Sequence, residues 1–189
     1  MIVLNKKTFS DRDDLNEDNF IKICLSPDNS LVPDLHDNLP GKSVWLPANN
    51  AVITEILGKE DLKVYFGVPE FLTTDLGPLI SKILRKKILN SISLAKKSGN
   101  LAIGIDEIKT QLTQKKHCLI LVAKGAKSLL KNSFFLSKNT SIFECMLEQD
   151  DLGKSTGKNN VKYVGILSKN FKKTIQVDLN KLKGFIDNH

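Results

Sequence analysis

Apolar side chains follow a helical period through the middle of the chain. They recur every three or four residues at Leu76, Leu79, Ile80, Ile83, Leu84, Ile88, Ile92 and Ala95. Asp75 can cap this helix, Pro78 lies in its first turn, and Gly99 can end it. The pattern predicts one long helix that begins after Asp75 and ends near Lys97.

Downstream, short apolar runs alternate with helical periods. We expect strands at 101–103, 117–123, 141–146 and 161–167. We expect helices from 105 to about 112, then at 126–136, 149–155 and 170–182. The run at 117–123 is continuously apolar, which is typical of a strand buried on both faces. Strands that alternate with helices predict a parallel or mixed sheet covered on both sides, an α/β fold of three α/β/α layers.

The first part of the chain has shorter elements. We expect strands at 20–25, 31–34 and the end of 39–47, followed by a helix over 51–57 that Asn49 or Asn50 caps and Gly58 ends. These elements make a small α+β unit. The segment 67–75 contains Gly and Pro and has no helical period, so we place a domain boundary there, with domains at 1–72 and 73–189.

Composition narrows the class of protein. The chain has 189 residues, of which 41% are hydrophobic, so wholesale disorder is excluded. The longest apolar run, 118–123, is too short to span a bilayer. In residues 1–7 the apolar stretch comes before the charged residues, and it is too short for a secretory signal. The three cysteines, Cys24, Cys118 and Cys145, are isolated and are expected to be reduced. We therefore expect a cytoplasmic globular protein.

The net charge of +7 is unevenly distributed. Residues 1–75 carry a balance of −6, whereas residues 76–189 carry +13. A strongly basic domain attracts polyanions, and nucleic acid is the usual one in the cytosol. Alternatively, the lysines are solvent-exposed surface residues that bind no partner.

Catalytic motifs are missing from the sequence. Gly41-Lys42-Ser43 and Gly153-Lys154-Ser155 lack the earlier glycine of a phosphate-binding loop, since those positions hold His36 and Glu148. No His or Cys pair has metal-ligand spacing. His117 and Cys118 resemble a base and a nucleophile, but neighbours in a strand point to opposite faces, so we do not expect them to act as such a pair. We expect neither enzymatic activity nor a cofactor.

About 100 residues resemble the ribosomal protein L7Ae superfamily. The similar segments are residues 92–107, 150–157 and 168–171. The resemblance implies an α/β/α sandwich that binds structured RNA, often kinked duplexes with tandem sheared pairs. The family's Gly-x-Asn-Glu-x-x-Lys pattern is altered here, because Asp106 replaces Asn and Thr110 replaces Lys.

The first part more faintly resembles the bacterial YlxR-like family. Residues 26–29, 32–34 and 39–45 are similar to its hairpin and glycine loop. Some bacteria fuse these two modules in this order, as cytoplasmic nucleic-acid-binding proteins. Here residues 11–18 are acidic and the loop reads Gly41-Lys42-Ser43 rather than Gly-Arg-Gly. Trp45 could stack on an unpaired base or close a small core. The possible site in this domain comprises Gly41, Lys42 and Trp45.

The candidate RNA site centres on the turn from Gly99 to Glu107. A helix N-terminus offers free amides to a phosphate, and lysines near it neutralise charge. Glu107 could accept hydrogen bonds from guanine, or it could simply complement the helix dipole. The resemblance also suggests that the loop 146–149 contacts an extruded base. The candidate residues are Lys96, Lys97, Gly99, Asn100, Gly104, Asp106, Glu107, Lys109, Lys124, Lys127 and Leu147. We expect Lys96, Lys97, Lys124 and Lys127 at one rim of the fold.

The sequence therefore predicts a non-catalytic protein that binds structured RNA. Its expected partners include the ribosome or other ribonucleoprotein components, and no membrane. One alternative is a protein-interaction adaptor whose acidic first domain docks a basic partner. A second is a substrate-recognition domain detached from an RNA-modifying enzyme.

Overall fold

The computed structural model describes residues 17–72, 75–114, 118–136, 140–144 and 147–186. The chain divides into two compact units. The first runs from Met1 to Leu84 and also includes Asn180–His189, and the second is Arg85–Leu179. The domain boundary between residues 72 and 73 remains a prediction from the sequence.

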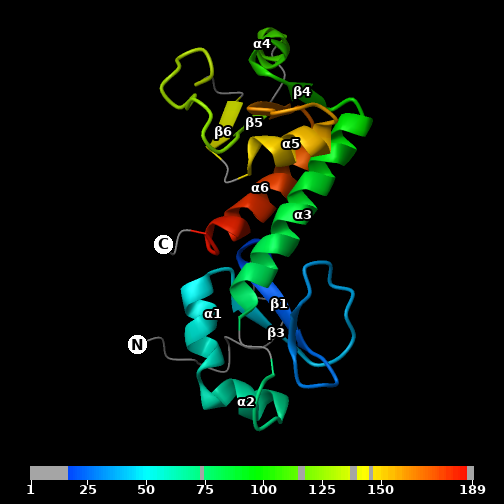
Figure 1. The fold of residues 1–189 in the computed structure, drawn as a ribbon, viewed down its shortest axis with the longest axis vertical. Coiled ribbons are helices and arrows are strands. Elements are labelled where there is room, and N and C mark those ends of the chain that lie inside the picture. The colour runs from blue at the N-terminus through cyan, green and yellow to red at the C-terminus, as the bar shows by residue number, and fades with distance from the viewer. Residues whose placement is uncertain (1–16, 73–74, 115–117, 137–139, 145–146, 187–189) are drawn as a thin grey trace. The chain divides into compact units, whose positions relative to one another are not determined.

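The first unit contains a small antiparallel sheet (Figure 1). A 3-10 helix, Glu17–Asn19, precedes β1 (Phe20–Leu25), which pairs with both β2 (Leu31–Pro33) and β3 (Ser43–Pro47) in the order β2-β1-β3. All three strands were predicted. Pro33 lies on an edge strand, where the missing N–H costs no central hydrogen bond.

Two short helices follow the sheet of this unit. The N–H of Val52 donates 3.2 Å to the Asn49 side chain, so the predicted cap begins α1 (Asn50–Leu57). A second helix, α2 (Glu60–Phe66), was not predicted and ends at Gly67, whose φ is +78°. The N–H of Asn50 also donates 2.8 Å to the Gly184 carbonyl, so the C-terminal residues join this unit.

The second unit contains a four-stranded mixed sheet in the order β4-β7-β5-β6. Its strands are β4 (Leu101–Ile103), β5 (Cys118–Val122), β6 (Thr140–Glu144) and β7 (Tyr163–Ile166). β5 and β6 are parallel, and the other two pairs are antiparallel. Every residue of β5 is buried, as its continuous apolar run predicted.

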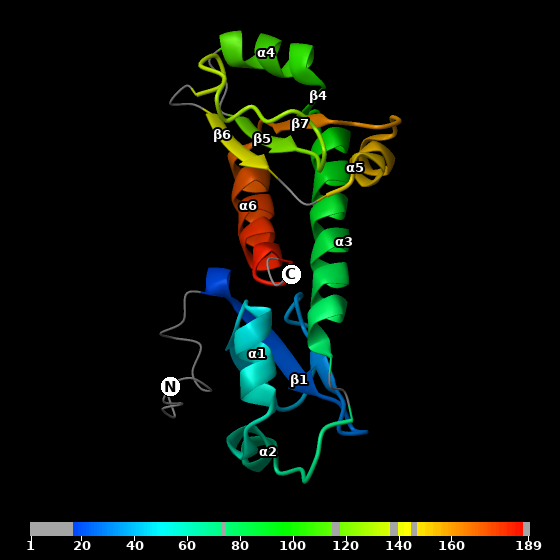
Figure 2. The same ribbon diagram turned by 60° about the vertical axis from the view of Figure 1, so that its left-hand side comes forward.

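Helices lie on both faces of this sheet. The helices are α3 (Leu76–Lys97), α4 (Ile105–Thr113), α5 (Gln149–Thr156) and α6 (Lys169–Lys183). Figure 2 shows α4 on one face and α5 with the second-unit parts of α3 and α6 on the other. The predicted α/β/α layering is therefore confirmed. In the described residues, no helix has both the length and the apolar character needed to cross a membrane.

The predicted helix at 126–136 is wrong. The described residues there form turns and bends. Ser128 and Asn132 use their side chains to accept from the N–H groups of Leu130 (3.2 Å) and Phe134 (3.1 Å). Such local bonds give the backbone an alternative to helical hydrogen bonds. Leu129 and Phe135 nevertheless reach the core on the α4 face, where a helix would have placed its apolar stripe.

The described cysteines are core residues. Cys24 and Cys118 are buried free thiols, and burial raises the pKa of Cys118 to about 12. Cys145 and His117 lie outside the described residues. Within the described ranges, no three His, Cys, Asp or Glu side chains are grouped so as to hold a metal ion.

Candidate nucleic-acid interface

The N-terminus of α4 begins at an open glycine. Gly104 is the N-cap, with φ of 95°, and no side chain caps the helix. A Cβ added at Gly104 would meet no atom within 4 Å, so the backbone is accessible there. The N–H groups of a first helical turn have no partners within the helix. This end of α4 can therefore receive an anion.

Glu107 has a structural partner in this turn. One carboxylate oxygen, Oε2, accepts from the N–H of Ile103 at 2.9 Å. Both Asp106 and Glu107 are exposed and lie in the first turn, where negative charge complements the helix dipole. The second oxygen of Glu107 can still accept a hydrogen bond from a ligand.

The turn after β5 carries two of the predicted lysines. The N–H of Lys124 donates 2.9 Å to the Leu147 carbonyl, and the Gln149 side chain donates 3.3 Å to the Lys124 carbonyl. The ammonium of Lys124 also pairs with Glu148 at 3.0 Å, although both side chains are more than half exposed. Such an exposed pair contributes little and leaves Lys124 available to a phosphate.

Tyr163 connects this turn to the start of α4. Its carbonyl accepts from the N–H of Gly104 at 2.9 Å, and its hydroxyl donates to the Lys127 carbonyl at 2.9 Å. The register explains this position, since β7 begins beside the end of β5 and the end of β4. We call the surface formed by Gly104, Asp106, Glu107, Lys124, Lys127 and Tyr163 the Tyr163 edge. Tyr163 was not among the predicted site residues; its sequence signal is an aromatic side chain within the strand expected at 161–167.

The residues that end α3 lie elsewhere. Gly99 has φ of 71°, and the N–H of Asn100 donates 2.8 Å to the Ala95 carbonyl, which closes the helix. Asn100 precedes β4, whereas Gly104 follows it, so the two are separated by about 13 Å along the strand. The expected single rim is therefore divided between the two ends of β4.

Lys96 and Lys97 differ in their surroundings. The Lys96 ammonium donates to the carbonyl of Thr156 at the end of α5, where a cation is favourable. Lys97 is exposed, as is Lys109 on α4. Of the two α3 lysines, Lys97 is thus the better phosphate ligand.

Leu147 is fully buried, with 0% of its surface exposed. A base that docks at the 147–149 loop would meet the exposed Glu148 or the partly exposed Gln149 rather than the leucine side chain.

The first unit has a pocket of about 630 Å³, which two of its three predicted site residues line. Gly41, whose φ is 104°, and Lys42 line it together with apolar residues such as Leu25 and Leu39. The Lys42 ammonium lies 4.7 Å from the centre of the Tyr65 ring and donates to the Tyr65 carbonyl. Trp45 is half-buried on β3, opposite Lys22.

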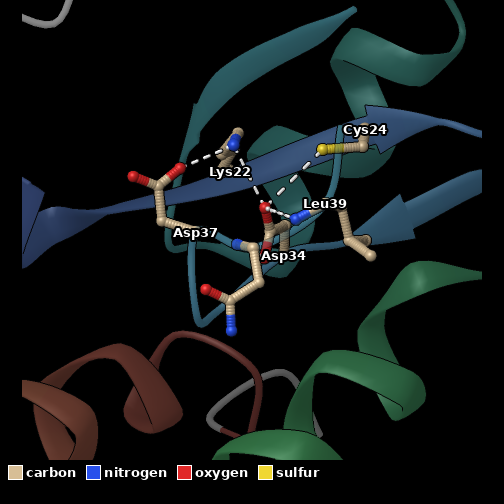
Figure 3. Close-up of polar contacts among 6 residues, drawn as sticks. Lys22, Cys24, Asp34, Asp37 and Leu39 are labelled. Atoms are coloured by element: carbon tan, nitrogen blue, oxygen red, sulfur yellow. Dashed lines mark hydrogen bonds and ion pairs between the residues drawn. The ribbon is translucent and has the colours of Figure 1, made fainter. Parts of the chain in front are cut away.

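A buried carboxylate fixes the loop that leads to Gly41 (Figure 3). Asp34 accepts from the N–H groups of Asn38 and Leu39, both at 3.0 Å, and pairs with Lys22 at 3.1 Å. Burial alone would raise the pKa of Asp34. The two backbone hydrogen bonds and Lys22 outweigh burial and lower the pKa to about 2. Asp34 is thus ionised at neutral pH and acts as a structural anchor.

Comparisons with known proteins find one family model that matches residues of the second unit. Residues 86–176 match the model of the Ribosomal protein L7Ae/L30e/S12e/Gadd45 family. A solved structure, a protein of unknown function from Bacillus halodurans, is 17% identical with a TM-score of 0.41, and the match covers 50% of this chain and 97% of that one. No curated protein matches the chain. L7Ae family members bind RNA and are generally non-catalytic. Residues 86–176, slightly less than half of the chain, are thus similar to the L7Ae/L30e/S12e/Gadd45 family.

Proposed function

We propose that this chain is a non-catalytic RNA-binding protein that holds structured RNA on the Tyr163 edge. The observation that carries the proposal is the junction at Tyr163. One residue joins an open helix N-terminus at Gly104 to a lysine-bearing turn at Lys127 through two hydrogen bonds of 2.9 Å. Amides and ammonium groups on one edge make a surface suited to an RNA backbone.

Each part of the edge has a distinct role in the proposal. The first-turn amides of α4 and the ammonium groups of Lys124 and Lys127 bind phosphates. The free oxygen of Glu107 accepts from a guanine edge, a contact that depends on base identity. Lys97 and Lys109 lie outside the edge and extend the basic surface.

Asp106 and Thr110 favour structured RNA other than a standard kink-turn. They replace the Asn and Lys of the kink-turn pattern, and the Thr110 hydroxyl donates 3.0 Å back to the Asp106 carbonyl. An acidic side chain next to phosphates weakens binding.

The first unit contributes less affinity in this proposal. Residues 1–75, which make up most of this unit, carry a balance of −6, and Lys22 and Lys42 already have internal partners. We also propose that the first unit is YlxR-like. The protein is further proposed to be cytoplasmic and to bind ribosomal or other ribonucleoprotein components.

Ultraviolet crosslinking in the cells that make this protein tests the proposal. The crosslinked RNA is sequenced, and the crosslinked peptides are identified by mass spectrometry. We expect base-paired RNA and crosslinks within residues 103–109 and 123–127. Crosslinks confined to the first unit, or none above the level of an unrelated basic protein, would contradict the proposal.

A further inference from the structure

Three large apolar side chains are exposed on the segment between β5 and β6. Leu130 is 48% exposed, Phe134 44% and Leu136 57%, all within the 124–136 stretch that forms turns instead of a helix. We call residues 124–136 the β5–β6 connection. Exposed apolar groups this close together in sequence often mark a binding surface.

The β5–β6 connection is anchored beneath these side chains. Leu129 and Phe135 are buried in the core next to Ile108 of α4. The ring of Phe134 packs edge-on against Phe135, with ring centres 5.1 Å apart and planes at 82°. The backbone is held by the Asn132 side chain, which accepts from the N–H of Phe134 at 3.1 Å. Phe134 is therefore a fixed aromatic surface.

The β5–β6 connection carries charged side chains of one sign, although Lys124 at its start pairs with Glu148. The sequence between Glu107 and Glu144 contains seven lysines and no acidic residue. Lys127 and Lys131 flank Leu130 and are exposed. A partner that offers both negative charge and flat apolar faces fits this combination, and single-stranded nucleic acid has that chemistry.

We propose that the β5–β6 connection binds a single-stranded RNA segment that continues from the structured RNA on the Tyr163 edge. Phe134 stacks on an unpaired base, and Lys127 and Lys131 bind the flanking phosphates. The two surfaces are continuous, because Lys127 belongs to both and its carbonyl accepts a hydrogen bond from the Tyr163 hydroxyl. This inference rests on the proposed function and names a second feature of its RNA.

The test compares two probes with the full-length chain: a blunt RNA hairpin, and the same hairpin with a single-stranded uridine tail. We expect the tail to tighten binding about tenfold, as one stacked base does. Phe134→Ala should remove this gain and leave binding of the blunt hairpin unchanged. Phe134→Trp should keep the gain, and Leu94→Ala, at a 55% exposed leucine on α3, is the matched control.

A tail that gives wild-type protein no gain, or a gain that survives in Phe134→Ala, would overturn the inference. So would a dimer in sedimentation that Phe134→Ala abolishes, since a second copy would then cover this surface. If wild-type protein fails to bind the blunt hairpin, the proposed function itself is wrong and this inference falls with it.

Discussion

The hydroxyl of Tyr163 donates a hydrogen bond of 2.9 Å to the carbonyl oxygen of Lys127. These residues lie 36 positions apart in the sequence: Tyr163 begins β7, and Lys127 lies in the turn segment that follows β5. The bond holds the lysine-bearing turn beside the N-terminus of α4, whose Gly104 donates to the Tyr163 carbonyl. Tyr163 is thus a positioning residue for the proposed interface.

Replacing Tyr163 with Phe removes this hydrogen bond and keeps the ring. We expect the free energy of unfolding to fall by about 1 kcal/mol, the usual net value of one such bond. Amide hydrogen exchange should accelerate in residues 124–128 and remain unchanged in α6. Equal acceleration in both segments would show that the bond has no local role.

Glu107→Gln separates the two roles of this side chain. An amide oxygen can still accept from Ile103, so we expect the free energy of unfolding to change by less than about 0.5 kcal/mol. Loss of the charged acceptor should weaken the preferred RNA by about 1–3 kcal/mol relative to a scrambled sequence. Unchanged preference in filter-binding titrations would make Glu107 purely structural.

Asp34 makes the stability of the first unit depend on pH. Its pKa is about 2 in the folded protein and 3.8 ordinarily, so folding favours the ionised form. The resulting stabilisation, about 2 kcal/mol, is complete above the ordinary pKa and is lost as pH falls toward 2. Urea unfolding at a series of pH values should show this decline, and Asp34→Asn should flatten it. An equally steep decline in Asp34→Asn would assign the effect to other groups.

Lys87 and Asp178 form an ion pair of 3.0 Å between α3 and α6, with Asp178 buried. The second oxygen of Asp178 has no hydrogen-bond partner among the described residues. Lys87→Met should therefore destabilise the protein by about 3–5 kcal/mol, because it leaves a buried charge unpaired. Adding Asp178→Leu should recover most of that loss in thermal unfolding. No recovery would mean that packing, rather than charge, is the cause.

Much of the fold was predictable because its signals are local. The long period of α3, the apolar run of β5 and the Asn49 cap each depend on neighbouring residues. The helix predicted at 126–136 is wrong because the apolar spacing of this segment suits a helix. The side chains of Ser128 and Asn132 instead accept hydrogen bonds from nearby N–H groups, which favours turns.

The candidate site was predictable only in part. Gly104 and Glu107 follow from a glycine before an acidic first turn. Tyr163 and the separation of Lys96 from Lys124 depend on strand register, which sequence periodicity does not specify for a three-residue strand such as β4. The hydrogen bond from the Asn50 N–H to the Gly184 carbonyl is likewise a long-range contact that no local sequence pattern indicates.

One comparison of charge-matched variants tests whether RNA binds at the Tyr163 edge. Lys124→Gln/Lys127→Gln removes two positive charges from the edge. Lys169→Gln/Lys173→Gln removes two from exposed positions on α6. Affinity for a structured RNA is measured for both at several salt concentrations.

We predict that the edge variant binds at least about tenfold more weakly and that its salt slope falls by about two, one unit for each lost phosphate contact. The α6 variant should stay close to wild type in both quantities. If both variants lose affinity equally, binding follows net charge alone, and the Tyr163 edge is not the RNA site.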